Sequence, residues 1–248
     1  MKARNLVIII AVVLLTAICC LAVRNGGIVI TEQTAEKAVI SGRVTKHRDT
    51  IPHLDTTSQT ILLIGDSMAY TLMFRMQNYC SYNGHNLHVV SWVAASTKTY
   101  AECDTLSYFI RLYKPTYIIF VIGANELFAY QALKRVVYVN TITDQIEGIK
   151  TVWIGPPNWK PDTGINKMLM DRFGPKKFFL SKDLTFTRIK GDVAHPDRAS
   201  GSMWVDSIAD WIMNKSKYPI KLLPPDKNNP IRVDFVKLVL PKKCEKTK

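Results

Sequence analysis

The sequence predicts an α/β domain built on a parallel sheet that helices cover on both faces. Short apolar runs, such as residues 61–64 (ILLI) and 116–122 (TYIIFVI), alternate with longer amphipathic segments, and Gly or Pro residues separate the two kinds. Runs that are apolar on both faces are typical of buried parallel strands. Strands that alternate with helices favour a covered parallel sheet. We therefore expect functional residues at the carboxyl ends of the strands.

Each element follows from a local pattern. The run at 61–64 predicts a strand that Gly65 ends, and the amphipathic segment from residue 68 to about 82 predicts a helix. Further strands are expected at residues 87–93, 116–122, 151–154 and 177–180, and further helices at residues 100–113, 130–148, 164–173 and 198–213. Pro115 and Gly148 end two of these helices, as Pro and Gly commonly do.

Composition and hydropathy divide the chain into four parts. With 248 residues, 47% of them hydrophobic, the chain can bury one sizeable core. Lys2 and Arg4 precede an uncharged run at residues 6–23, which Arg24 closes. Such a run is either an uncleaved membrane anchor or a cleaved signal peptide, and both would export the remainder. The expected parts are an anchor or signal at 1–24, a polar stalk at 25–59, the α/β domain at 60–214 and a basic, proline-containing extension at 215–248.

The basic extension holds ten Lys or Arg residues against three acidic ones, in a chain of formal net charge +13. No recognisable nucleic-acid-binding module accompanies this charge, so nucleic acid is excluded as a partner. The charge is either simply solvated or favours an anionic cell-surface polymer or membrane face. An apolar run at residues 231–240 predicts that the extension wraps the domain or adds an edge strand.

After the first 24 residues the cysteines are Cys80, Cys103 and Cys244. An exported protein can form disulfides. Because Cys80 lies late in the first expected helix and Cys103 lies early in the next, these two could pair. Unpaired buried thiols are the alternative.

Polar side chains follow the expected strands at their carboxyl ends. Ser67 comes after the first strand, where it is either a nucleophile or only a helix cap. Ser96 lies in a turn of small residues after the second strand, and Asn125 follows the third. Such turns can offer N–H donors to an oxyanion, and they also occur as ordinary turns. Asp192 and His195 precede the last helix, and a His oriented by a carboxylate is the natural base for a Ser nucleophile.

Taken together, these blocks resemble the SGNH (GDSL-type) hydrolase family over residues 60–214. The matching blocks are Gly65-Asp66-Ser67, Gly123-Ala124-Asn125 and Asp192-Val193-Ala194-His195, in the order that the family has them. This sequence departs from the family's pattern at the second block, where Ala95-Ser96 stands in place of the usual Gly. Asp66 is not a triad member in this family, and we expect it to shape its turn.

The resemblance implies a flavodoxin-like α/β/α sandwich and a catalytic triad of Ser67, Asp192 and His195. It also implies an oxyanion hole made of the Ser67 backbone N–H, the Asn125 side chain and one N–H of the second block. Ser96 is the expected third donor, provided that its backbone conformation is tolerated without Gly.

The resemblance further implies a serine esterase that hydrolyses small acyl esters, acetyl above all, on a carbohydrate or cell-envelope glycan. Trp159, which follows a Pro pair near the active edge, is the aromatic residue best placed to stack on a sugar ring, whereas the spacing of Trp204 fits the core. No apolar lid typical of a long-chain lipase is present between the blocks.

Two other functions stay open at this stage. One is an O-acetyltransferase of an envelope glycan, for which a membrane partner would deliver the acyl group. The other is a non-catalytic glycan-binding protein that retains the fold. No cofactor or metal is expected, since His85 and His88 lack acidic or Cys partners in the sequence. The expected location is the cell membrane, facing the periplasm, or the periplasm or exterior after cleavage.

Overall fold

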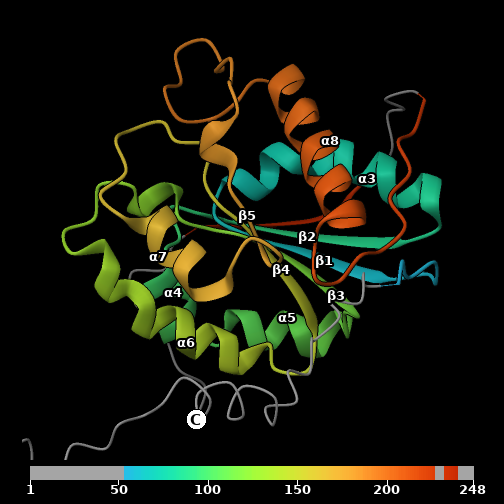
Figure 1. Cartoon of the computed structure of the whole chain (residues 1–248), viewed down its shortest axis with the longest axis horizontal. Helices are drawn as coiled ribbons and strands as arrows, with labels where there is room; N and C mark the ends of the chain where they lie inside the picture. The colour runs from blue at the N-terminus through green and yellow to red at the C-terminus, as the bar shows by residue number, and fades with distance from the viewer. Residues whose placement is uncertain (1–52, 227–231, 240–248) are drawn as a thin grey trace, which may run out of the picture. The chain divides into compact units, whose positions relative to one another are not determined.

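A computed structural model describes residues 53–226 and 232–239 (Figure 1). All of these residues belong to one compact unit of the chain. The predicted anchor or signal at 1–24 and most of the predicted stalk lie outside the described residues. Within the described part, no helix is long and apolar enough to cross a membrane.

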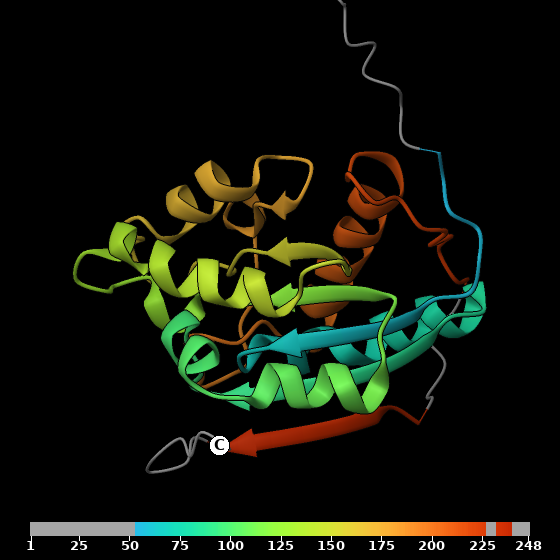
Figure 2. The same cartoon turned by 90° about the horizontal axis from the view of Figure 1, so that it is seen from below.

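The described unit is built on one sheet of six parallel strands, which confirms the predicted α/β class (Figure 2). The strand order is β5-β4-β3-β1-β2-β6. The strands are β1 Thr60–Gly65, β2 Asn86–Val93, β3 Tyr117–Val121, β4 Lys150–Ile154, β5 Phe178–Phe179 and β6 Asp234–Val239. Strand β1 lies between β2 and β3, so the chain builds outward from it in both directions.

Helices cover both faces of this sheet. In Figure 1, helices α3 and α8 lie above the sheet and helices α4 to α7 below it. The helices are α3 Met68–Asn83, α4 Thr97–Glu102, α5 Thr105–Tyr113, α6 Val136–Gln145, α7 Ile165–Phe173 and α8 Arg198–Asn214, with short 3-10 turns η1 Ala124–Glu126, η2 Ala132–Arg135 and η3 Ser181–Asp183. Two apolar clusters fill the spaces between the sheet and these layers.

The apolar run of β1 contributes to both clusters. Ile61 and Leu63 pack into the cluster with α3 and α8, while Leu62 and Ile64 pack into the opposite one. All four side chains are fully buried. Because burying one such side chain stabilises a fold by roughly 1.5–3 kcal/mol, this strand is a principal anchor of the core. The two-sided burial predicted from the run is confirmed.

Two predicted helices differ from those observed. The helix expected at 100–113 is two helices, α4 and α5, separated at Cys103, whose backbone is extended. Helix α4 begins at Thr97 because the Ser96 side chain accepts the Thr99 N–H and completes a capping box. The helix expected at 130–148 starts with η2, after Gln131 adopts a left-handed conformation at φ 57°, and only then continues as α6.

The apolar run in the basic extension forms an edge strand, as one of the two predictions for it stated. Strand β6 pairs in parallel with β2, from His88 opposite Asp234 to Val93 opposite Val239. Earlier in the extension, Ile220 is fully buried and forms a parallel bridge with Asp55. The sheet therefore includes chain from well beyond residue 214.

The predicted disulfide between Cys80 and Cys103 is wrong. Cys80 is a free thiol buried in the cluster under α3 and α8, and burial raises its pKa. Cys103 is disulfide-bonded and lies in the cluster on the opposite face of the sheet. The sheet stands between the two residues, so neighbouring positions along the sequence do not bring them together.

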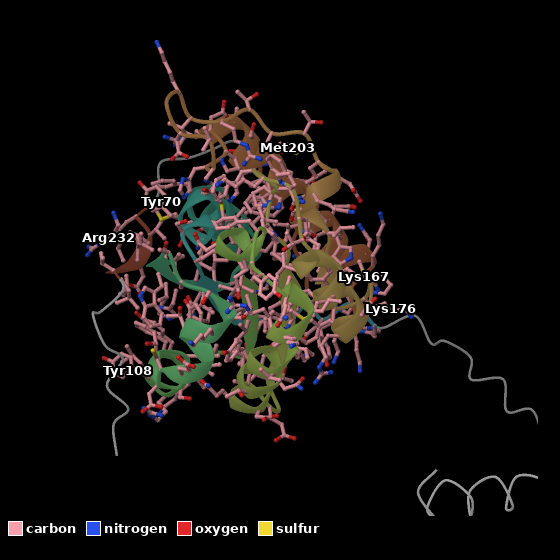
Figure 3. The ribbon with its side chains drawn as sticks, turned by 90° about the vertical axis from the view of Figure 1, so that its left-hand side faces the viewer. Tyr70, Tyr108, Lys167, Lys176, Met203 and Arg232 are labelled. Carbon is pink, nitrogen blue, oxygen red and sulfur yellow. The ribbon has the colours of Figure 1, made fainter. Side chains whose placement is uncertain are left out.

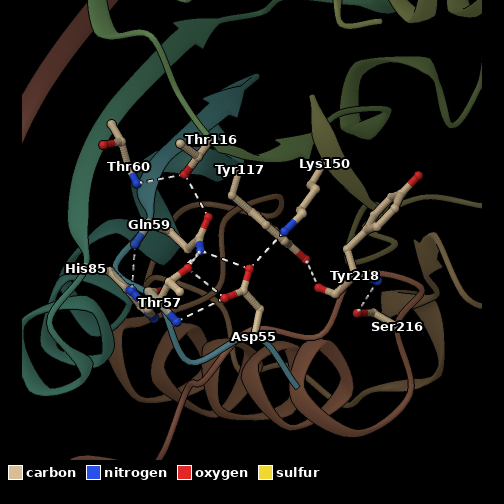
Figure 4. A network of polar contacts seen from close by, with 10 residues as sticks. All are labelled: Asp55, Thr57, Gln59, Thr60, His85, Thr116, Tyr117, Lys150, Ser216 and Tyr218. Carbon is tan, nitrogen blue, oxygen red and sulfur yellow. Dashed lines mark hydrogen bonds and ion pairs between the residues drawn. The ribbon is translucent and has the colours of Figure 1, made fainter. Parts of the chain in front are cut away.

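A polar network connects the N-terminal ends of the strands, opposite the C-terminal ends at which functional residues are expected (Figure 4). Lys150, at the start of β4, donates to the Asp55 carboxylate at 2.8 Å, and this bond holds the pKa of Asp55 well below its usual range. Thr116, just before β3, accepts the N–H of Thr60 at 3.0 Å and donates to Gln59 at 2.8 Å. The network thus joins the segments at which β1, β3 and β4 begin.

Candidate active site

The turn after β1 presents Ser67 at the carboxyl edge of the sheet. Gly65 is required there, because a Cβ at this position would lie 1.8 Å from the carbonyl oxygen of Val121 in β3. Ser67 is the N-cap residue of α3, but its side chain makes no capping hydrogen bond. Its hydroxyl instead lies 2.8 Å from Nε2 of His195. The interpretation of Ser67 as only a helix cap is therefore wrong.

The capping bond comes from the neighbouring Asp66. Its Oδ1 accepts the N–H of Met68 at 2.9 Å, and its Oδ2 accepts the N–H of Ala124 at 3.1 Å. The side chain thus links the turn after β1 to the turn after β3. Asp66 is fully buried, and desolvation raises its pKa to about 7, with a further upward contribution from Glu126.

His195 and Asp192 lie in the loop before α8. Nδ1 of His195 is 2.7 Å from Oδ2 of Asp192, while Oδ1 of Asp192 accepts the backbone N–H groups of Ala194 and His195 at 2.8 and 3.0 Å. These backbone bonds, more than the ring contact, lower the pKa of Asp192 to about 2. The carboxylate is therefore ionised at neutral pH and holds the imidazole with Nε2 directed at the Ser67 hydroxyl.

Arg188 holds the loop that carries His195. Its Nη1 donates to the carbonyl oxygen of Ala194 at 2.6 Å, and its Nη2 donates to those of Pro157 and Asn158, both at 3.1 Å. Partial burial lowers the pKa of the guanidinium, an effect that Asp192 opposes. Arg188 thereby ties the His195 loop to the turn that follows β4. Nothing in the sequence pattern pointed to it.

The three residues expected as oxyanion donors differ in what their N–H groups contact. In the described part of the chain the Ser67 N–H donates no hydrogen bond. Asn125 follows β3 in η1, is half-buried, and donates from Nδ2 to the carbonyl oxygen of Ala95 at 2.9 Å. That bond joins the turn after β3 to the turn after β2.

The third donor, Ser96, is occupied elsewhere. Its N–H donates to Oγ1 of Thr99 at 3.2 Å within the capping box of α4. The left-handed conformation of this turn falls instead on Ala94, at φ 59°. A left-handed non-Gly residue is uncommon. The backbone position that suits glycine is thus Ala94, not Ala95 or Ser96.

A buried carboxylate joins the same turns from below. Glu126, 1% exposed, accepts the N–H of Thr97 at 2.8 Å and its hydroxyl at 2.7 Å, and Arg135 lies 3.6 Å away. Burial raises the pKa of Glu126, and the Thr97 bonds and Arg135 oppose that rise. Its role was not expected from the sequence, because its partners come from two other segments.

Of the tryptophans considered as sugar contacts, two are buried in the core and one lies near the candidate site. Trp92 and Trp204 are 2% and 0% exposed, so neither offers a face to a ligand, and the core position expected for Trp204 is confirmed. Trp159 is half-buried and donates from Nε1 to the carbonyl oxygen of Ala124, next to Asn125. The Phe128 ring lies edge-on to it, with ring centroids 5.9 Å apart.

The two histidines considered as metal ligands have other contacts. His85 accepts the N–H of Gln59 at Nδ1 and contacts the carbonyl oxygen of Lys221 at Nε2. His88 is paired with the Asp234 carboxylate of β6. Among the described residues, no group of three or more His, Cys, Asp or Glu side chains could hold a metal ion.

The site is therefore a hydroxyl, an imidazole and a carboxylate in hydrogen-bonded series, next to an unoccupied backbone N–H and a side-chain amide. A scan of the chain against protein-family models and a search of curated protein sequences found no match.

Proposed function

We propose that this protein is a serine esterase of the SGNH type, acting on small acyl esters of a carbohydrate. The observation that carries the proposal is the unbroken series from Ser67 Oγ through His195 to Asp192, with contacts of 2.8 and 2.7 Å. A hydroxyl, a base and an orienting carboxylate in this order are the components of nucleophilic acyl transfer.

The arrangement of the strands supports the same proposal. The order β2-β1-β3-β4-β5 is that of flavodoxin-like sheets, whose ligands bind where the connections leave β1 and β3 in opposite directions. Ser67 follows β1 and Asn125 follows β3, so both stand at this switch point. Strand β6 is an addition beyond β2.

In the proposed mechanism, His195 takes the hydroxyl proton as Ser67 attacks the ester carbonyl carbon. The Ser67 N–H and the Asn125 amide stabilise the negative charge on the carbonyl oxygen, after Asn125 exchanges its bond to Ala95 for the substrate. The ester C–O bond then breaks, and His195 gives its proton to the leaving alcohol. Water, activated by His195, hydrolyses the acyl-enzyme.

Trp159 and Phe128 are the proposed contacts for the sugar beside the oxyanion donors. Lys160 lies 4.6 Å from each of these two rings, so the pair is an amphipathic surface with a cation above it. Aromatic faces of this kind suit sugar rings, which present C–H groups and hydroxyls together.

The location that we propose is outside the cytoplasm. The disulfide at Cys103 supports it, because disulfides persist in oxidising compartments. The uncharged run at 6–23 supports attachment to the membrane or passage across it. An acyl-enzyme at this place could also pass its acyl group to a sugar hydroxyl, which keeps the transferase as the second candidate.

The test is release of p-nitrophenol from p-nitrophenyl acetate by the full chain, beside Ser67→Ala and Asn125→Ala. We expect Ser67→Ala to abolish turnover and Asn125→Ala to lower kcat about 10²–10³-fold, the usual effect of losing one oxyanion donor. Thr141→Ala, on the far helix α6, is the control and should leave turnover unchanged. Turnover that survives in Ser67→Ala would contradict the proposal. Acetate transfer to an added sugar, in place of release, would favour the transferase.

A further inference from the structure

A pocket lies beside the loop that carries His195, where Pro196 forms part of its lining. It occupies about 130 Å³ between α3 and the loop that leads into α8. One wall is the face of α3 below Ser67, with Tyr70, Thr71 and Phe74 at the third, fourth and seventh positions after the nucleophile. The other wall includes Ile189 and Pro196, and Pro196 directly follows His195.

The pocket wall is aromatic and accessible. Tyr70 and Phe74 are 49% and 40% exposed, and their rings meet edge-on with centroids 6.1 Å apart. Tyr70 also packs against Phe235 of β6, at 5.5 Å between centroids, and Figure 3 places it at the edge of the molecule on the side that carries Arg232. Large aromatic side chains that are exposed to solvent add little to the core, and grouped on a surface they mark a ligand-binding site.

Of the two arginines that line the pocket, Arg75 is ion-paired and Arg198 is paired with no acidic side chain among the described residues. Asp197 accepts the N–H of Ser200 at 2.8 Å and caps α8, and Arg75 is paired with Asp206 at 2.7 Å. The guanidinium of Arg198 lies over the Phe74 ring, 5.4 Å from its centroid, and pairs with no acidic side chain in the described part of the chain. The guanidinium of Arg198 is thus an exposed group of N–H donors that lies over one of the pocket's aromatic rings.

The position of the pocket relative to Ser67 and His195 determines which part of an ester can bind in it. In acyl transfer the imidazole hands its proton to the leaving alcohol, so the alcohol lies on the imidazole side of the nucleophile. Pro196 and Ile189 belong to the His195 loop, and the Ile189 N–H donates to the carbonyl oxygen of His195 at 3.1 Å. The pocket therefore continues from the place where the alcohol leaves.

We propose that this pocket binds the alcohol portion of the substrate, and that this alcohol is a sugar ring carrying an anionic group. The esterified ring stacks on Tyr70 and Phe74, and Arg198 binds its anionic group, while Trp159 and Phe128 contact a neighbouring sugar unit of the same glycan. Arg forks bind carboxylates and phosphates with two parallel hydrogen bonds. The inference rests on the esterase proposed above and adds to it the class of alcohol.

The first test compares acetate release from 3-O-acetyl methyl glucuronoside and 3-O-acetyl methyl glucoside by the full chain. Arg198 would bind the carboxylate of the uronoside with two parallel hydrogen bonds at an exposed site, so kcat/KM should favour the uronoside several-fold. Arg198→Gln should remove this preference, and Arg198→Lys should retain part of it. A 6-phosphate analogue of the glucoside, run in parallel, tells whether carboxylate or phosphate is preferred.

The matched control is Arg172→Gln. Arg172 also lies over a phenylalanine, Phe173, at 5.6 Å, but on α7, and it should leave the preference intact. An equal kcat/KM for both sugars, or a preference that Arg198→Gln leaves unchanged, would overturn the pocket assignment even if p-nitrophenyl acetate turnover depends on Ser67.

A binding measurement separates this inference from the esterase proposal. Titration calorimetry of the two sugar esters against the Ser67→Ala chain needs no turnover. Tighter binding of the uronoside that is lost in Ser67→Ala/Arg198→Gln supports the pocket whatever the reaction proves to be. Equal binding of both esters overturns it.

Discussion

The two oxygens of the Asp192 carboxylate have different partners in the loop before α8. Oδ1 of Asp192 accepts two backbone N–H groups, which fixes the carboxylate, and Oδ2 faces the imidazole of His195. The backbone donors also keep the acid ionised, with its pKa at about 2. The residue therefore sets both the orientation and the tautomer of the ring before any substrate arrives.

Asp192→Asn should retain the shape of the loop and lose the reaction. An amide at Oδ2 can donate to Nδ1, which moves the ring proton to Nε2, where it cannot accept the Ser67 proton. We expect kcat to fall about 10³–10⁴-fold with little change in KM. The measurement is steady-state turnover of p-nitrophenyl acetate, with near-UV circular dichroism as the check on folding. A loss of less than tenfold would mean that Asp192 does not orient the base.

Asp66 couples stability to pH. Its folded-state pKa of about 7 lies above the usual value of 3.8, so the folded chain keeps a proton that the unfolded chain has released. The stability contributed by the protonated acid is complete below about pH 4 and is lost as pH rises through about 7. The slope over this window is roughly 1.4 kcal/mol per pH unit for one such group.

The check is urea unfolding of the full chain between pH 4 and pH 8, beside Asp66→Asn. The wild-type free energy of unfolding should decline with pH more steeply than that of the variant, which does not titrate at this position. Absolute stability is not the readout, because Asn leaves one of the N–H groups of Met68 and Ala124 without an acceptor. Parallel pH profiles for the two chains would show that Asp66 does not titrate in this range.

At the scale of elements, the apolar runs and the Gly and Pro residues between them predicted most of the helices and strands. The runs in β1 and β3 and the apolar spacing of α3 and α8 are local signals, and the structure has these elements within a few residues of the predicted bounds. The break between α4 and α5 was missed because the apolar spacing runs on through Cys103, while the capping box of Ser96 and Thr99 starts α4 early.

The parts that sequence reasoning missed depend on contacts between distant segments. Glu126 acquires its role from Thr97 and Arg135, and Arg188 from carbonyl groups of two other loops. The disulfide prediction failed for the same reason, since Cys80 and Cys103 lie on opposite faces of the sheet. The hydrogen-bonded series of Ser67, His195 and Asp192 was predictable because each residue stands in a short block beside a recognisable element.

The close approach of β1 and β3 makes Gly65 a sharp test of the architecture. Gly65→Ala would place a methyl group 1.8 Å from the Val121 carbonyl oxygen, so backbone has to move at the turn that carries Ser67. We expect a loss of stability of roughly 3 kcal/mol or more. The control is Gly148→Ala, at φ 80° with open space around it, which should cost about 1–2 kcal/mol for backbone strain alone. Equal losses in thermal or urea unfolding would contradict the close contact.

At the scale of the whole described unit, the N-terminal and C-terminal ends of the strands carry different kinds of contact. The network of Asp55, Lys150, Gln59 and Thr116 fastens the amino edge, while the carboxyl edge gathers three loops around Ser67. Asp66, Glu126 and Arg188 tie those loops to one another below the reacting groups. These contacts hold the three loops together around Ser67 and His195.

The most direct test of the central claim is covalent labelling of the full chain with a fluorophosphonate, followed by peptide mass spectrometry. Such a reagent reacts with a serine only where a base has activated the hydroxyl. We predict a single adduct on Ser67, formed rapidly in the wild type and suppressed in His195→Ala. No adduct, an adduct on another serine, or equal labelling of Ser67 in His195→Ala would contradict the assignment of Ser67 as the activated nucleophile.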